Sequence, residues 1–239
     1  MLWRFLSDCP DTTTAVLVRR KGSLTAEKRV RLLLGKKIFK EIVQASGGIE
    51  PLMAQRVQVI EGDLPEVPEL PRDIDVLVHC AGDVSFDPPI DQAFMTNVVG
   101  TKALLGRFLE SCSDADGNLE RIPHYVHIST AYTAGRRRGA IPEAAHVHDV
   151  DYEKEAAAAL AMKKHVEARS RSSEQLTILR KQAEKLHRQA GYLTTSEDTE
   201  RRRQEWVKAE LVAAGTERAR SLGWTDVYTF AKALGERVV

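Results

Sequence analysis

Cysteine is scarce in this sequence, which contains only Cys9, Cys80 and Cys112. The three form no CxxC spacing and have no pair of histidines close by, so the sequence indicates neither a disulfide framework nor a zinc knuckle. We therefore expect no metal site, and we expect a reducing, cytoplasmic location.

Long hydrophobic runs and an excess of one charge are also absent. The apolar stretch within residues 1–10 is too short for a signal peptide, and no later segment approaches the roughly 20 apolar residues that span a bilayer, so we expect no transmembrane segment. The 239 residues include 35 Lys and Arg against 34 Asp and Glu, a net charge of +1. This balance excludes binding to nucleic acid or to a membrane by bulk charge alone.

What the sequence does contain is a series of short apolar runs, each followed by small or polar residues. The runs span residues 15–18, 57–60, 74–79 and 125–129. Helical periodicity occupies about 25–43 and 91–110, and the first residues resemble the end of an amphipathic helix. Strands that alternate with helices predict an α/β fold with a Rossmann-like, doubly wound parallel sheet.

The strand pattern stops between about Val150 and Gly223, where Ala, Leu, Glu, Lys, Arg and Gln predict a long helical insertion. We interpret the insertion as a hairpin of two helices, the first ending at Gly191 and the second capped by Thr194 or Thr195. An apolar seam of the first helix would pack against the second: Leu176, Leu179, Ala183, Leu186 and Ala190 against Trp206, Val207 and Leu211.

Open parallel sheets bind ligands outside the carboxyl ends of their strands, so the residues after each apolar run are candidate site residues. They are Arg19–Arg20, Asp63–Leu64, Ala81–Gly82 and Ser129–Thr130. In a dinucleotide fold, a basic residue after the second strand meets a ribose 2′-phosphate, whereas an acidic residue binds a free 2′-hydroxyl. The arginine pair therefore favours NADP over NAD, with a solvated loop of surface arginines as the alternative.

Tyr228 and Lys232 are the sharpest local feature, because residues four apart share one face of a helix. The positive charge of Lys232 would favour loss of the phenol proton, and such a tyrosine can donate a proton to a carbonyl oxygen as hydride arrives at carbon. The hydroxyl of Thr130 could hydrogen-bond the same carbonyl. A chance pair on a surface helix is the alternative.

Four segments carry a family resemblance: Val76–Phe86, Asn97–Thr101, His127–Tyr132 and Gly223–Glu236. They resemble the extended short-chain dehydrogenases and, within these, the fatty acyl-CoA reductases and related thioester reductases. The resemblance covers most of the chain outside the insertion. Bacterial members of this reductase group carry a similar long helical segment before the Tyr-Lys motif.

The resemblance implies catalytic roles for three residues. Tyr228 would be the general acid, Lys232 would bind the nicotinamide ribose, and Thr130 would orient the thioester or aldehyde carbonyl, with Ser129 as the fallback. The implied reaction is reduction of a long-chain acyl-CoA by NADPH to an aldehyde, a primary alcohol, or both.

The resemblance also implies where the cofactor would lie. Asp63 and Leu64 would sit by the adenine, Arg19 by the 2′-phosphate, and Ala81 and Gly82 along the cofactor backbone. The implied organisation is a partial NAD(P)-binding domain over residues 1–149, the helical insertion over 150–223, and the Tyr-Lys helix of the first domain over 224–239. Asn97 would hold helix and sheet together.

The sequence departs from the family pattern at both ends. The Gly-rich turn that joins the first strand to the first helix is absent, although its glycines let the backbone approach the pyrophosphate. The chain also stops soon after Lys232. We therefore expect a fragment whose sheet lacks its first strand, and which by itself binds no cofactor.

Two other functions stay open. The chain could be a catalytically silent fragment that acts as a helical interaction module through residues 150–223. It could also be a nucleotide-sugar epimerase or steroid dehydrogenase of the same superfamily, although the surroundings of Phe86 and the run 224–230 favour the acyl-CoA branch.

Several further features have a plainer interpretation. We interpret a cluster of acidic and histidine residues as a polar loop rather than a metal site: His146, His148, Asp149 and Asp151. Arg136–Arg138 is interpreted equally as a contact to CoA phosphates or as a solvated turn, and Arg201–Arg203 as part of a charge-balanced helix. Cys80 is interpreted as a core residue.

Overall fold

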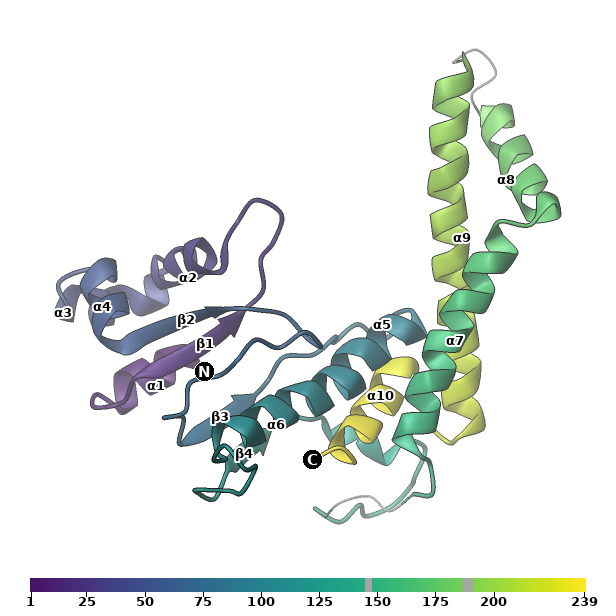
Figure 1. Cartoon of the computed structure of the whole chain (residues 1–239). Helices are drawn as coiled ribbons and strands as arrows, with labels where there is room; N and C mark the ends of the chain where they lie inside the picture. The colour runs from purple at the N-terminus through teal and green to yellow at the C-terminus, as the bar shows by residue number, and fades with distance from the viewer. Residues whose placement is uncertain (145–147, 187–190) are drawn as a thin grey trace. The chain divides into compact units, whose positions relative to one another are not determined.

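A computed structural model describes residues 1–144, 148–186 and 191–239 of the chain (Figure 1). The chain divides into two compact units, Met1–Arg72 and Asp73–Val239, each with its own core.

The first unit is a pair of parallel strands with helices around it. Its elements are α1 (Leu2–Asp8), β1 (Thr14–Val18), α2 (Ala26–Leu34), η1 (Lys37–Phe39), α3 (Lys40–Ala45), α4 (Ile49–Arg56) and β2 (Val57–Glu61). The register of β1 and β2 runs from Thr14 opposite Val57 to Val18 opposite Glu61. The core of this unit contains Leu6, Val30, Leu34, Phe39, Leu52 and Val57.

The helix predicted over residues 25–43 is real but interrupted. It begins where the Thr25 side chain accepts a hydrogen bond from the Lys28 amide, a regular N-cap. It ends at Gly35, because glycine is a poor helix former and here caps the last turn. The chain then forms the short 3₁₀ segment η1, which buries Phe39, before α3 begins.

The second unit contains the other parallel pair, β3 (Val76–His79) and β4 (His124–His127), with Val76 opposite His124. Between the two strands run α5 (Ile90–Phe94), the π-helical turn η2 (Met95–Val99) and α6 (Gly100–Ser111), which together fill the helix predicted over residues 91–110. After β4 come the 3₁₀ segment η3 (Ala131–Ala134) and, near the end of the chain, α10 (Val227–Glu236).

The predicted helical insertion consists, in its described part, of α7 (Tyr152–Ser170), α8 (Ser173–Leu186) and α9 (Gly191–Ser221). The prediction of two helices is therefore wrong, because the chain bends between α7 and α8. Gly191 begins a helix rather than ending one, and Thr194 and Thr195 lie inside α9. Ala190, predicted for the seam, lies outside the described residues.

The predicted seam is half correct. Leu179 and Ala183 are buried, and α8 packs along α9. Leu176 and Leu186, however, are 36% and 64% exposed. The seam partners Val207 and Leu211 belong to a core cluster with residues of α7, and among the described residues no member of that cluster comes from α8. The partner helix was misassigned because α9 is long enough to pack against α8 and α7 in succession.

The mixed α/β class with parallel strands is confirmed. Within the described ranges, β1 pairs with β2 alone and β3 with β4 alone. The division into domains 1–149, 150–223 and 224–239, and the lack of a first strand, stay predictions. No described helix is both long enough and apolar enough to cross a bilayer.

Candidate active site

Lys232 occupies the carboxyl end of the β3–β4 ladder. Its Nζ donates a hydrogen bond to the Ile128 carbonyl oxygen at 2.8 Å, and the residue is only 6% exposed. The preceding rung is intact, because the Ile128 amide donates to the His79 carbonyl at 2.9 Å. In a ladder that continued, the next donor to the Ile128 carbonyl would be the Ala81 amide. The ammonium takes that place, so it stands at the strand ends where ligands of parallel sheets bind.

Tyr228 lies one turn before Lys232 on α10 and is half-buried. The helix begins at Asp226, whose side chain accepts a hydrogen bond from the Thr229 amide at 2.8 Å. Phe86, on the loop after β3, packs edge-on against the Tyr228 ring with 5.5 Å between ring centroids. Phe86 is itself 59% exposed, so the pair forms an accessible aromatic contact beside the Tyr-Lys motif.

Thr130 and Ser129 follow directly after the carbonyl that Lys232 binds. Thr130 is the N-cap of η3, and its hydroxyl oxygen accepts a long hydrogen bond of 3.4 Å from the Tyr132 amide. The Ser129 hydroxyl is buried without a hydrogen-bond partner among the described residues. The Thr130 hydroxyl thus keeps its hydrogen for a ligand, whereas the Ser129 hydroxyl is shielded from solvent.

The segment after Thr130 packs against α10. The Trp224 indole Nε1 donates to the Thr133 carbonyl at 2.9 Å, and the Arg136 amide donates to the Gly223 carbonyl at 2.9 Å. Contacts between η3 and α10 complete the packing. The structure thus brings together the strand end that carries Thr130 and the helix that carries the Tyr-Lys motif.

Gly82 lies on the loop after β3, where no side chain fits. A Cβ at this position would be 2.9 Å from the Asn97 side-chain oxygen. Asn97 is buried in the π turn; its Oδ1 accepts from the Asp83 amide at 2.9 Å and its Nδ2 donates to the Asp83 carbonyl at 3.1 Å. These bonds fix the loop that carries Ala81 and Gly82, which is the holding role expected of Asn97.

The first unit contains the other predicted cofactor contacts. Arg19 and Asp63 follow β1 and β2, and their charged groups are 3.8 Å apart with both side chains more than half exposed. The Leu64 amide donates to the Asp63 side chain at 2.9 Å. Arg20 is occupied by an ion pair with Glu61 at 2.9 Å. Both arginine side chains are more than half exposed, and Arg19 is the one whose ion pair is the longer.

A polar cluster that was not among the predicted site residues lies on β3 and β4, the two strands at whose ends Lys232 is bound. His79 Nδ1 lies 2.7 Å from the Tyr125 hydroxyl and 3.2 Å from His127 Nδ1. Burial, assisted by the positive charge of Lys232, lowers the pKa of each histidine to about 4. Burial also raises the pKa of Tyr125 above its ordinary value. A signal was present in the sequence, since a histidine stands at the same register position of two apolar strands.

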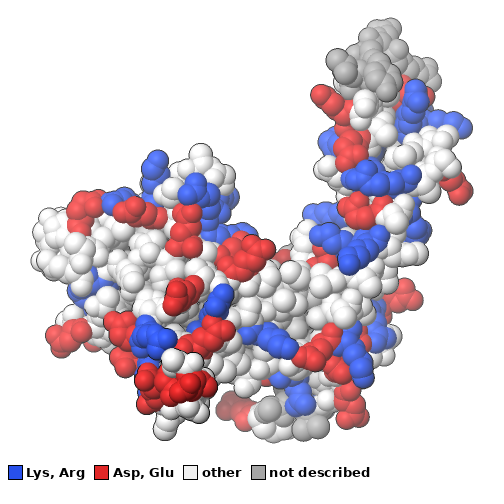
Figure 2. Space-filling view, viewed as in Figure 1, with Lys and Arg blue, Asp and Glu red and all other residues white. Residues whose placement is uncertain are grey.

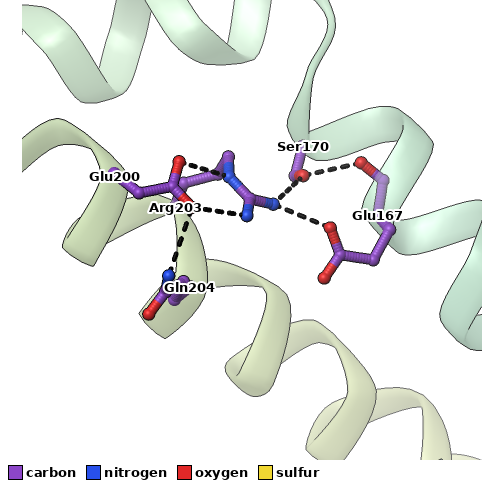
Figure 3. Close-up of polar contacts among 5 residues, drawn as sticks. All are labelled: Glu167, Ser170, Glu200, Arg203 and Gln204. Carbon is purple, nitrogen blue, oxygen red and sulfur yellow. Dashed lines mark hydrogen bonds and ion pairs between the residues drawn. The ribbon is translucent and has the colours of Figure 1, made fainter.

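A second missed feature is the Arg203 cluster in the helical segment (Figure 3). The Arg203 guanidinium, only 6% exposed, binds Glu200 on its own helix and Glu167 on α7, each at 2.7 Å, and the Ser170 hydroxyl at 2.8 Å. Its hydrogen bond lowers the pKa of Glu200 to about 2. The charge balance predicted for Arg201–Arg203 is correct, and Figure 2 shows both signs interspersed along α8 and α9.

Three lesser interpretations have different outcomes. Cys80, predicted to lie in the core, is exposed, because β3 ends at His79 and the chain leaves the sheet there. Asp151 caps α7 through hydrogen bonds from the Glu153 and Lys154 amides, while His146 lies outside the described residues. Arg136–Arg138 is an exposed segment.

A parallel α/β unit with a Tyr-x-x-x-Lys helix at the strand ends is typical of the short-chain dehydrogenase class of nicotinamide-dependent oxidoreductases. Comparison with known proteins narrows this class. The family described as male sterility protein, an NAD-binding family, matches residues 1–239, and the chain belongs to this family.

The curated relatives agree with that assignment. Over 94% of the chain it is 28% identical to the alcohol-forming fatty acyl-CoA reductase of Simmondsia chinensis. It is 30% identical over 64% of its length to fatty acyl-CoA reductase 1 of Xenopus laevis, and 24% identical over 94% to the probable fatty acyl-CoA reductase 5 of Arabidopsis thaliana. The aligned region spans 42%, 29% and 42% of these relatives, respectively.

Proposed function

We propose that this chain carries the cofactor-binding and catalytic part of a reductase that uses NADPH to convert a long-chain fatty acyl-CoA thioester to an aldehyde, a primary alcohol, or both. The observation that carries the proposal is the position of Lys232, which replaces the next rung of the β3–β4 ladder one helical turn after Tyr228. The names of the curated relatives support the substrate class.

The strand ends suit a nicotinamide cofactor. Lys232 uses one of its three N–H donors on Ile128, Ser129 has an unpartnered hydroxyl, and Gly82 leaves the loop after β3 without a side chain. When bound, the cofactor supplies hydride to the carbonyl carbon. The proposed preference for NADPH over NADH rests on the sequence alone, in which a basic pair follows residues 15–18.

In the proposed reaction, one group of residues would supply the proton and another would orient the substrate carbonyl. The Tyr228 hydroxyl donates a proton to the oxygen of the substrate carbonyl, and Lys232 stabilises the phenolate that remains. The hydroxyl of Thr130, or that of Ser129, donates a hydrogen bond to the same oxygen and so orients the carbonyl. Thioester reduction gives the aldehyde with loss of CoA, and a second reduction would give the alcohol.

The surroundings of Tyr228 fit an apolar substrate. Phe86 contacts the tyrosine ring, and Val84 on the same loop is 73% exposed. Tyr132, on the segment after β4, is 67% exposed. Large apolar side chains left open at both strand ends are suited to contact an acyl chain. The curated relatives named above are fatty acyl-CoA reductases rather than epimerases or steroid dehydrogenases, which favours the acyl-CoA branch.

The test is acyl-CoA-dependent oxidation of NADPH by the protein produced from its full reading frame, with NADH compared in parallel. Tyr228→Phe should abolish turnover and leave cofactor affinity, measured by NADPH fluorescence, nearly unchanged. Tyr152→Phe, at a tyrosine on α7 that has no part in the proposed site, is the matched control. A Tyr228→Phe protein that keeps most of its turnover would remove Tyr228 from the mechanism.

We also propose a cytoplasmic location, which cell fractionation would test.

A further inference from the structure

Three polar aromatic side chains share one face of the β3–β4 pair. The register places Leu77 opposite Tyr125 and His79 opposite His127, and side chains two residues apart point to the same face of a strand. His79 is only 2% exposed. Its Nδ1 lies 2.7 Å from the Tyr125 hydroxyl and 3.2 Å from His127 Nδ1. A ring nitrogen has one hydrogen or one lone pair, so these two contacts share it, with the shorter one to Tyr125, and they join the three side chains into one hydrogen-bonded row.

This row directly precedes the rung that receives the ammonium. The His79 carbonyl accepts the Ile128 amide at 2.9 Å, and the Ile128 carbonyl accepts Lys232 Nζ at 2.8 Å. Ile128 is thus held at its amide by the His79 backbone carbonyl, and its own carbonyl, in the next peptide group, accepts the hydrogen bond from Lys232. A shift of either histidine strand would move the carbonyl that holds the ammonium.

The row is polar but carries no charge at neutral pH. Burial, together with the ammonium of Lys232, lowers the pKa of both imidazoles to about 4. Burial lowers the pKa of Lys232, and the charges of Glu236 and Cys80 act in the opposite sense but are the smaller effects. Nε2 of each histidine is buried without a hydrogen-bond partner in the part of the chain that the structure describes. Apolar side chains would fill the same space without leaving such atoms unpaired.

We propose that His79, Tyr125 and His127 are positioning residues for Lys232: the hydrogen-bonded row fixes the last rung of the β3–β4 ladder, so that the Ile128 carbonyl holds the ammonium beside Tyr228. This inference rests on the proposed function for its catalytic meaning. Its structural content concerns only where Lys232 is held, and it can be tested without any turnover.

The first experiment measures how exposed Lys232 is. The purified chain is labelled with a trace of acetic anhydride, and acetylation of Lys232 is quantified by mass spectrometry against that of Lys164, an exposed lysine. His127→Leu should raise the relative labelling of Lys232 at least tenfold, whereas His127→Asn, which keeps a polar group near the Nδ1 position, should stay close to wild type. His124→Leu, at an exposed position of the same strand, is the matched control.

Unchanged labelling in a folded His127→Leu protein would overturn the proposal. A second measurement decides the matter if that variant does not fold. In Tyr125→Phe, which removes only the hydroxyl that lies 2.7 Å from His79 Nδ1, the relative labelling of Lys232 should also rise; unchanged labelling in that variant would overturn the proposal. If labelling responds as expected but no acyl-CoA-dependent oxidation is found, the positioning cluster stands and the proposed function fails.

Discussion

Gly235 of α10 lies against the backbone of Asn97 so closely that a Cβ at position 235 would be 2.4 Å from the Asn97 carbonyl oxygen. The same carbonyl accepts a hydrogen bond from the Thr101 hydroxyl at 2.8 Å, so it cannot easily move aside. This contact sets how near the Tyr-Lys helix comes to the π turn whose asparagine holds the loop after β3. A glycine that no sequence pattern singled out thus helps to position the candidate site.

Gly235→Ala should therefore destabilise the protein, by about 1–3 kcal/mol, as overpacking of a tight contact typically does. The matched control is Gly106→Ala in α6, where an added Cβ meets nothing within 4 Å. That change should stabilise by up to about 1 kcal/mol, because alanine is the better helix former. Urea unfolding measures the change in the free energy of unfolding for both variants. Equal changes would contradict the expected close contact at Gly235.

Arg203→Met should lower the free energy of unfolding by about 1–3 kcal/mol, because Glu167 and Glu200 would lose a shared cation that is itself buried. Arg180→Met is the control, since the Arg180 side chain is 61% exposed and forms an ion pair across one turn with Glu184. Its cost should stay near or below about 0.5 kcal/mol. Chemical denaturation measures both, and an Arg203 variant as stable as the control would show that the buried network adds nothing.

Stability should fall on mild acidification because of His79 and His127. Their pKa is about 4 in the folded chain, below the ordinary value of 6.5, so the unfolded chain binds more protons between these two values. Folding stability is therefore full above about pH 6.5 and is lost progressively as the pH falls toward 4. Because one pKa unit corresponds to about 1.4 kcal/mol, the loss should be at most about 3 kcal/mol per histidine.

Urea unfolding at several pH values between these limits tests this expectation. A His79→Gln, His127→Gln double variant should show a flatter dependence, whereas His124→Gln should keep the wild-type slope. Equal slopes in all three proteins would assign the acid sensitivity to other groups.

The two hydroxyls after β4 should respond differently to removal. Ser129→Ala should leave stability unchanged or slightly raised, because its buried hydroxyl has no partner in the described structure. Thr130→Val should lower kcat about 10²-fold if this hydroxyl orients the substrate carbonyl, a typical cost for one such donor. Steady-state kinetics of the full-length enzyme decide which of the two hydroxyls orients the carbonyl. A large loss of kcat in Ser129→Ala, with little loss in Thr130→Val, would give that role to Ser129 instead.

Much of the candidate site could be predicted from local pattern. The apolar runs located β1 to β4 within about two residues, since a buried parallel strand must be apolar and must end where polar residues begin. The spacing of Tyr228 and Lys232 predicted a shared helix face, and α10 provides it. Predictions that needed a partner helix were less successful: Val207 and Leu211 are buried as expected, but against α7.

The amino-acid sequence by itself determined the class of fold, the strand ends and the Tyr-Lys motif, because each depends on residues near one another in the chain. Only the tertiary structure decided that Lys232 takes the place of a missing ladder rung, that two histidines and a tyrosine lie beneath it, and that Arg203 is buried between helices. These depend on strand register and on contacts between residues 33 to 104 positions apart, which no local periodicity encodes.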